Sequence, residues 1–177
     1  MPRDSSLTLR PAQSRDARGV AAVHVGSWQA AYRGLVPEKF LDALDVDERA
    51  NSYRFGARGP DETVVWIVAQ GENVVGFIAV GRCRDDDHVG AGEVWALYVA
   101  PTRWRSGIGS RLLSKGEELL AQRGFAEATL WVLERNAPAR RFYESAGWHY
   151  DDKVQTIQDS TSPRCVISSP CRDRITK

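Results

Sequence analysis

The chain has 177 residues, of which 42% are hydrophobic, and its formal net charge is +1. This length favours one folded domain with a sizeable core, and the near-neutral charge gives no indication of a nucleic-acid-binding surface. No stretch has the ~18 apolar residues of a membrane span or the pattern of a signal peptide, which predicts a soluble, cytoplasmic protein that does not bind membranes. The three cysteines form no C-x-x-C pair and lie near no histidines at metal-ligand spacing, so we expect free thiols and no metal site.

Hydrophobic periodicity and turn residues predict alternating elements. In chain order these are a strand at 7–12, a helix from Asp16 to about Gly34, helical pieces at 37–44 and 46–55, strands at 63–70, 73–83 and 93–101, a helix from two glycines to Gly124, a strand at 127–133 and a helix at 136–147. The strands at 63–70 and 73–83 are expected to form an antiparallel hairpin. This order indicates an α/β (α+β) fold, a mixed sheet with helices on both faces.

The segment "RSGIGSRLL" places Gly107 and Gly109 at the start of a helix, directly after a strong strand. A dinucleotide-binding turn would need a third glycine where the chain has Leu112, and a Walker loop would need lysine where it has Ser110, so neither motif fits. A helix N-terminus still offers about four unpaired N–H groups and the positive end of its dipole. The segment therefore predicts a diphosphate site, and a simple loop is the alternative.

Two longer stretches, "EVWALYVAPTRWRSGIGSRLL" at 93–113 and "LWVLERNAPARRFYESAGW" at 130–148, resemble the acetyl-CoA motif and the following strand and helix of the GNAT superfamily of N-acetyltransferases. The similarity covers about residues 7–150. It implies a largely antiparallel central sheet and a single N-acetyltransferase domain at 7–177, after an N-terminal extension at 1–6. The tail at 151–177 contains Pro163 and Pro170, which restrict strands, so short or irregular strands are expected there.

The resemblance also implies a function. An enzyme of this family moves an acetyl group from acetyl-CoA to a primary amine of a small molecule or peptide by direct attack in a ternary complex, and a homodimer is compatible with it. The alternative is that the same fold binds acyl-CoA without catalysis, as a sensor or regulatory module.

Cofactor contacts are implied from three places: the backbone of a splayed strand, the loop and helix start that hold the pyrophosphate, and the following helix. These residues are Leu97, Tyr98 and Val99; Trp104, Arg105, Ser106, Gly107, Ile108, Gly109 and Ser110; and Asn136 and Tyr143. The chain departs from the family at Trp104, where Arg or Gln is usual, and at Arg105, where Gly is frequent. Arg103 and Arg105 are candidates for the adenosine 3′-phosphate, with solvated surface charges as the alternative.

Tyr143 and Glu93 are the expected catalytic residues. The family position matched by Tyr143 holds a tyrosine that protonates the departing thiolate, and aromatic packing is the alternative role. Glu93 is the candidate base. By strict alternation it shares a face with Trp95, Leu97 and Val99, and apolar surroundings would raise its pKa. An exposed strand-end carboxylate, with a water chain as the base, is the alternative.

The acceptor cleft of the family is walled by the first helices, which implies substrate contacts from Trp28 and Tyr32 and a nearby Phe55. Core packing is the alternative for all three, and His24 is expected to be a packed histidine. The acidic loop at 85–87 either draws in a cationic acceptor or is a solvated turn. Antibiotics, polyamines, amino acids and protein N-termini all stay open as acceptors.

Overall fold

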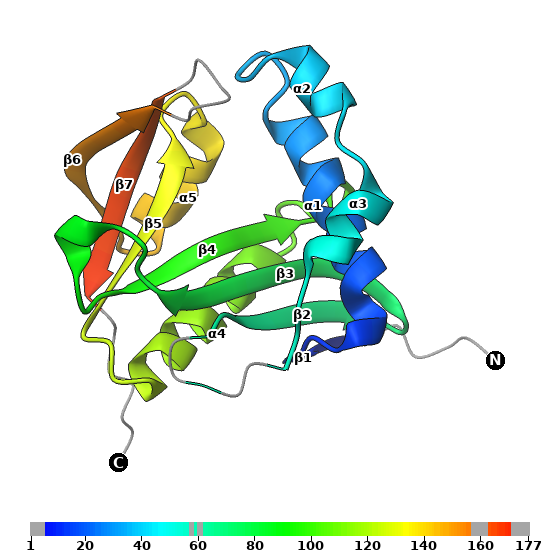
Figure 1. Ribbon diagram of the computed structural model, residues 1–177, viewed down its shortest axis with the longest axis horizontal. Helices are drawn as coiled ribbons and strands as arrows, with labels where there is room; N and C mark the ends of the chain where they lie inside the picture. The colour runs from blue at the N-terminus through cyan, green and yellow to red at the C-terminus, as the bar shows by residue number, and fades with distance from the viewer. Residues whose placement is uncertain (1–5, 57–58, 60–61, 157–162, 171–177) are drawn as a thin grey trace.

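The computed structural model describes residues 6–56, 59, 62–156 and 163–170 (Figure 1). The helices and strands are β1 (Leu7–Pro11), α1 (Ala17–Ala31), α2 (Glu38–Asp42), α3 (Val46–Ser52), β2 (Val64–Gln70), β3 (Asn73–Arg82), β4 (Gly92–Val99), α4 (Ile108–Gln122), β5 (Glu127–Leu133), α5 (Ala137–Ser145), β6 (His149–Thr156) and β7 (Pro163–Pro170). The predicted elements between residues 7 and 147 are confirmed, with small shifts at their ends. Apart from Ser6, the predicted N-terminal extension lies outside the described residues, as does the C-terminal end of the tail. No helix in the described ranges is long and apolar enough to cross a membrane.

The strands form one sheet in the order β1-β2-β3-β4-β5-β7-β6, and among the described pairs only β4 and β5 run parallel. One core packs α4 and α5 against one face of the sheet, and a second packs α1 against the other. Figure 1 shows α4 behind the central strands and α1 with α3 in front of them. These observations confirm the predicted mixed, largely antiparallel sheet with helices on both faces.

The sheet opens between β4 and β5. Their ladder covers three residue pairs and ends at Val94 and Leu130. Beyond that point the strands diverge, and Figure 1 shows β4 running toward α1 while β5 runs beside α5. We call the space between the diverging strands the β4–β5 gap. Because no described strand pairs with this side of β4 beyond Val94, the backbone groups there that accept no side-chain hydrogen bond are available to a ligand.

A bulge in β4 changes which side chains share a face. The register between β3 and β4 shifts at Trp95, which is the extra residue. Leu97 and Val99 pack into the core below α4, whereas Trp95 and Tyr98 pack with the core below α1. The prediction that Glu93 and Trp95 share a face with Leu97 and Val99 is therefore wrong, because the extra residue reverses the alternation.

The C-terminal strands are longer than predicted. Both β6 and β7 have eight residues, and β7 lies inside the sheet between β5 and β6. Pro163 and Pro170 are the first and last residues of β7. The N–H group that each proline lacks is therefore missing only at a strand end, and the hydrogen bonds along the interior of the strand can still form. The register of β6 is irregular only between Tyr150 and Val154.

The ends of α4 and α5 follow the sequence signals. Gly107 precedes α4 with a φ of +81°, and Gly124 follows it with a φ of +85°. Asn136 caps α5 because its side-chain oxygen accepts a hydrogen bond from the Ala139 N–H at 3.3 Å. Gly147 ends that helix with a φ of +88°. These caps fix where α4 and α5 begin relative to the β4–β5 gap.

Candidate functional site

The N-terminus of α4 is open to an anion. Its first intrahelical hydrogen bond runs from the Arg111 N–H to the Gly107 carbonyl at 3.1 Å, which leaves the amides of Ile108, Gly109 and Ser110 without a helical partner. No side chain caps this end, and a Cβ placed on Gly107 would meet no described atom within 4 Å. The free amides and the helix dipole therefore suit a diphosphate.

Gly109 has a different role from Gly107. A Cβ placed on Gly109 would lie 3.4 Å from the ring of Phe142 on α5. A larger side chain would push the two helices apart. Gly109 therefore permits the close approach of α4 and α5, whereas Gly107 supplies the left-handed backbone that begins α4.

The loop before Gly107 is tightly turned. Arg105 has a φ of +62° and is the only non-glycine residue with positive φ in the described part of the chain. The neighbouring Ser106 hydroxyl donates to the Arg103 carbonyl at 2.6 Å, which closes the turn. Where glycine is frequent in the family, this chain thus has an arginine side chain in a backbone conformation that favours glycine.

Replacing Arg105 with glycine is expected to raise the free energy of unfolding by about 0.5 kcal/mol, because relief of the left-handed strain exceeds the added chain entropy. Urea denaturation of the wild type and Arg105→Gly measures this. Arg103→Gly is the control, since Arg103 lies in a turn with negative φ and should lose stability. Equal losses in the two variants would contradict the assignment of strain to Arg105.

Side chains of this loop are held against the sheet. The Trp104 indole N–H donates to the Val99 carbonyl at 2.7 Å, although 45% of the Trp104 side chain is exposed. The Ser27 hydroxyl donates to the same carbonyl at 2.9 Å. The Arg103 guanidinium donates to the side-chain carbonyl of Gln70. Arg103 is therefore already engaged with the sheet, and Trp104 ties the loop to the end of β4.

The open edge of β4 presents alternate residues to the β4–β5 gap. The Ala100 N–H donates to the Val75 carbonyl at 2.9 Å, which sets the phase of the β3–β4 ladder. By the two-residue alternation, the amide of Tyr98 also points to β3, and those of Leu97 and Val99 point into the gap. Of the three backbone contacts predicted for β4, the amides of Leu97 and Val99 are thus the ones that face the gap, and the amide of Tyr98 pairs with β3. Leu97 keeps both its N–H and its C=O directed into the gap.

Tyr143 lies beside the same gap. Its side chain is 8% exposed and packs against the rings of Phe142 and Trp148. Burial, together with the nearby Tyr98 hydroxyl, raises the pKa of Tyr143 above its ordinary value. Tyr98 packs on the opposite face of the sheet, so the two hydroxyls interact where the sheet is open. Tyr143 stays protonated at neutral pH and can donate a proton.

Glu93 is buried in an ion pair. It is 1% exposed, and its Oε2 accepts hydrogen bonds from the backbone N–H and the Nε of Arg84, each at 3.0 Å. The Oε1 atom accepts from Nη2 of Arg84 at 2.5 Å. These bonds with Glu93 raise the pKa of Arg84, whose guanidinium carbon lies 4.2 Å from the centre of the Trp95 ring. The expected apolar surroundings and the alternative of an exposed carboxylate are both wrong.

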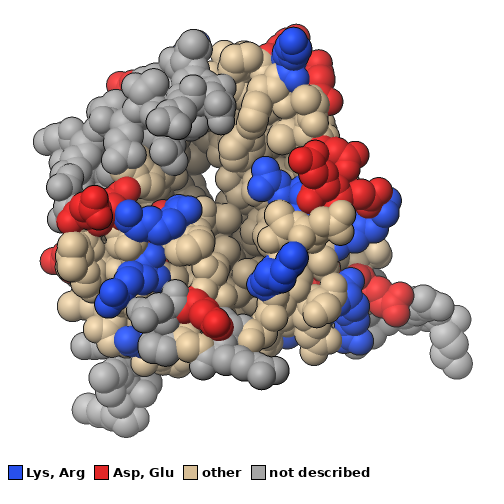
Figure 2. Space-filling view, viewed as in Figure 1, with Lys and Arg blue, Asp and Glu red and all other residues tan. Residues whose placement is uncertain are grey.

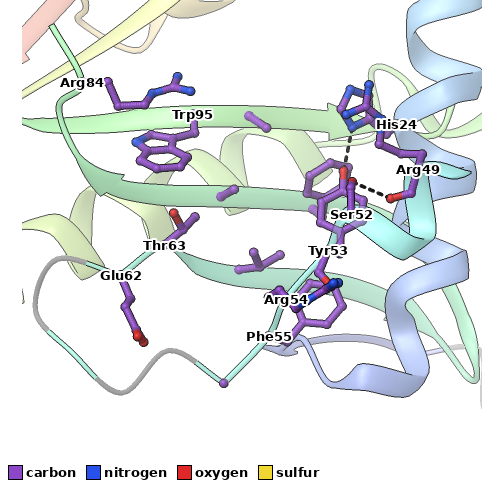
Figure 3. Close-up of a pocket in the computed structure, with 15 residues that line it drawn as sticks. His24, Arg49, Ser52, Tyr53, Arg54, Phe55, Glu62, Thr63, Arg84 and Trp95 are labelled. Atoms are coloured by element: carbon purple, nitrogen blue, oxygen red, sulfur yellow. Dashed lines mark hydrogen bonds between the residues drawn. The ribbon is translucent and has the colours of Figure 1, made fainter.

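A pocket of about 710 Å³ lies on the α1 and α3 face of the sheet. Figure 3 shows basic and aromatic side chains around it: His24, Arg49 and Tyr53 toward one end and Arg84 and Trp95 toward the other. In Figure 2 this face is hollowed near its middle, with Lys and Arg side chains on both sides of the hollow. Ala96 of β4 also lines the pocket and directly precedes Leu97. The pocket therefore reaches β4 beside the β4–β5 gap.

His24 is packed and also lines the pocket. Its Nδ1 lies 2.6 Å from the Tyr53 hydroxyl, and its ring stacks on Tyr98 with 4.8 Å between ring centres. Its Nε2 is buried without a hydrogen-bond partner among the described residues. Burial and, to a lesser extent, the charge of Arg49 lower the pKa of His24 to about 4. The imidazole is therefore neutral at pH 7.

The low pKa of His24 predicts an acid-sensitive fold. Between pH 6.5 and 4 the unfolded chain protonates this histidine and most of the folded chain does not, so stability is complete above pH 6.5 and falls by about 3 kcal/mol by pH 4. Urea denaturation at several pH values should show that His24→Gln lacks this part of the loss. His149→Gln, at an exposed histidine, should keep it. Identical pH profiles for His24→Gln and the wild type would contradict the expectation.

Trp28 and Tyr32 lie next to the pocket without lining it. Their rings contact each other at 4.9 Å between centres, in a cluster that includes Leu133 at the end of β5. Burial raises the pKa of Tyr32. Phe55 does line the pocket, where its ring stacks on Tyr53. Trp28 and Tyr32 thus pack between α1 and β5 at the end of the gap.

Sequence reasoning missed Arg49, Tyr53 and Arg84, because helical or strand periodicity marks none of them. They come from α3, from the residue after it and from the loop after β3, and only the tertiary fold brings them to one pocket. The acidic loop has a structural partner, since the Asp85 carboxylate accepts a hydrogen bond from the Trp131 indole at 2.8 Å. Asp85 therefore holds the loop to β5.

Comparison with known proteins agrees with this geometry. Residues 27–148 match the family described as "Acetyltransferase (GNAT) family", a stretch that contains β4, α4 and α5. YuaI of Bacillus subtilis (strain 168), an uncharacterised N-acetyltransferase, is 34% identical over 142 residues, which cover 78% of each chain. PaiA N-acetyltransferase from Thermoplasma acidophilum, solved with coenzyme A, superposes with a TM-score of 0.69 at 19% identity over 93% of this chain and 99% of that one. YncA from Salmonella typhimurium, solved with acetyl-CoA, gives a TM-score of 0.72 at 19% identity over 98% of both chains. From the matched family and the sequence relative together, this chain belongs to the GNAT family of acetyltransferases.

Proposed function

We propose that the chain is an acetyl-CoA-dependent N-acetyltransferase that moves the acetyl group to a primary amine by direct attack in a ternary complex. The observation that carries this proposal is the β4–β5 gap. The backbone of Leu97 faces this gap, Tyr143 belongs to the same core cluster as Leu97, and the uncapped start of α4 lies just after β4 in the chain. Two proteins of the same fold were solved with coenzyme A or acetyl-CoA, which supports the choice of donor.

The donor fits the residues present. The amides of Ile108, Gly109 and Ser110 would hold its diphosphate, and Gly107 leaves the approach open. The N–H and C=O of Leu97 would pair with the amide groups of the pantetheine arm, as an added strand pairs with a sheet edge. Bound in this way, acetyl-CoA supplies an activated acetyl group at the β4–β5 gap.

The chain's own groups then assist the transfer at two atoms. A backbone N–H of the open edge, that of Leu97 or Val99, polarises the thioester carbonyl, and losing a donor of this kind typically costs about 3 kcal/mol of transition-state stabilisation. As the nitrogen–carbon bond forms and the carbon–sulfur bond breaks, the nitrogen releases its second proton to solvent. Tyr143 gives its hydroxyl proton to the departing sulfur and recovers a proton from solvent. No covalent acyl-enzyme is required.

The proton of the acceptor ammonium must leave before or during the attack. Glu93 lies near the pocket, but both of its oxygens are bonded to Arg84. Direct proton transfer to Glu93 would have to displace these bonds. We therefore assign the proton to water that enters through the pocket, and we assign Glu93 and Arg84 a positioning role that holds the pocket wall beside Trp95.

Initial-rate kinetics of thiol release test the proposal. With acetyl-CoA and amine both varied, direct attack predicts double-reciprocal lines that intersect. It also predicts that kcat/KM rises with pH until the pKa of the acceptor amine is reached, since water is the immediate proton acceptor. Parallel lines would contradict direct attack and indicate a covalent intermediate. If kcat/KM instead rises with the same apparent pKa for amines of different pKa, a protein group accepts the proton. This result would contradict the assignment to water.

A further inference from the structure

Arg49 is a cation without an anionic partner in the described part of the chain. It comes from α3, is partly buried and lines the pocket. No carboxylate of the described residues forms an ion pair with it, whereas Arg84 pairs with Glu93 and Arg18 pairs with Asp47. A partly buried guanidinium at a pocket wall binds a carboxylate strongly, because its fork of N–H groups matches the two oxygens.

His24 lies beside Arg49 at the same end of the pocket, as Figure 3 shows. The Nδ1 atom of His24 lies 2.6 Å from the Tyr53 hydroxyl, and its Nε2 is buried. Arg49 is only partly buried, so at this end of the pocket it is the donor that a ligand can reach.

The rest of the pocket has a positive and an apolar part. Among the described residues, its charged side chains are Arg49, Arg54, Arg84 and Glu62. Because Arg84 is neutralised by Glu93, two arginines and one carboxylate of this described lining remain, which disfavours a polycationic acceptor. Trp95 supplies apolar surface at the Arg84 end. The volume of about 710 Å³ accommodates an acceptor of amino-acid or dipeptide size.

We propose that the acceptor is a small amine that carries a carboxylate, with the carboxylate held by Arg49. This inference rests on the proposed function. The apolar part of the acceptor lies toward Trp95. Its amine points toward Ala96 and the adjoining open edge at Leu97. The class thus defined is that of amino acids and their close analogues, rather than polyamines.

Binding of matched amines tests the proposal without relying on turnover. Calorimetric titration of the full chain, with coenzyme A present at saturation, compares L-phenylalanine with phenethylamine and L-leucine with isoamylamine, which differ only by the carboxylate, and adds spermidine. At least one carboxylate member should bind about tenfold or more tightly than its partner, as expected for a charge-assisted bidentate pair. Spermidine should bind more weakly than either amino acid. Equal binding within both pairs, preference for the decarboxylated amines, or binding of none would overturn the inference.

Variants locate the effect at Arg49. Arg49→Gln should abolish the preference for the carboxylate while leaving the affinity for coenzyme A unchanged. Arg15→Gln, which removes an exposed arginine outside the pocket, should keep the preference. A preference that persists in Arg49→Gln would overturn the assignment. Failure of the wild type to bind coenzyme A would instead count against the proposed function, so the two failures are distinguishable.

Discussion

Replacing Tyr143 with phenylalanine is expected to lower kcat by more than about tenfold, with little change in the affinity for acetyl-CoA. The hydroxyl is the only group removed, and the ring keeps its contacts with Phe142 and Trp148. Because burial raises the pKa of Tyr143, the wild-type hydroxyl is fully protonated at neutral pH and available to the leaving sulfur. Steady-state thiol release gives kcat, and calorimetry gives the dissociation constant.

Tyr150→Phe is the matched control. Its hydroxyl accepts a hydrogen bond from Arg140 and belongs to β6, away from the open edge of β4. This variant should keep its kcat, even if it loses some stability. Unchanged turnover in a folded Tyr143→Phe protein would refute the acid role and leave Tyr143 as a packing residue.

Gly107→Asp is expected to weaken acetyl-CoA binding by at least about a hundredfold. The variant should fold, since a Cβ at Gly107 meets no described atom within 4 Å and Asp tolerates positive φ better than most residues. Its carboxylate would cap the free amides of α4 and repel a diphosphate. Calorimetry with acetyl-CoA measures the loss, and circular dichroism confirms the fold.

Gly107→Asn separates charge from shape. Its side chain has the same size and can also cap the helix, but it carries no charge, so its loss of affinity should be clearly smaller. If a folded Gly107→Asp protein bound acetyl-CoA as well as the wild type does, the donor site would have to lie elsewhere.

The local features of the fold were predictable because each depends on neighbouring residues. The apolar stripe of α4, the cap at Asn136 and the left-handed glycines at 124 and 147 follow from short-range rules, and the structure confirms them. The resemblance of the two quoted stretches to the GNAT family likewise identified the family. These signals do not depend on how distant segments meet.

The remaining features depend on tertiary structure. One extra residue at Trp95 reverses the faces of β4 beyond it, and nothing in the local pattern marks a bulge there. The Glu93 carboxylate, which was expected to be the base, forms an ion pair with Arg84 from the segment between β3 and β4. The prolines at 163 and 170 suggested short strands, yet they lie at the two ends of an inner strand.

The most direct test of the proposed activity is a calorimetric titration with acetyl-CoA, with NAD and ATP as controls, followed on the same sample by thiol release with a pool of amines. The proposed function predicts binding of acetyl-CoA alone and release of thiol only when an amine is added. Binding without release from any amine would contradict catalysis and favour a sensor, and absence of acetyl-CoA binding would contradict the donor site at Gly107 and the β4–β5 gap.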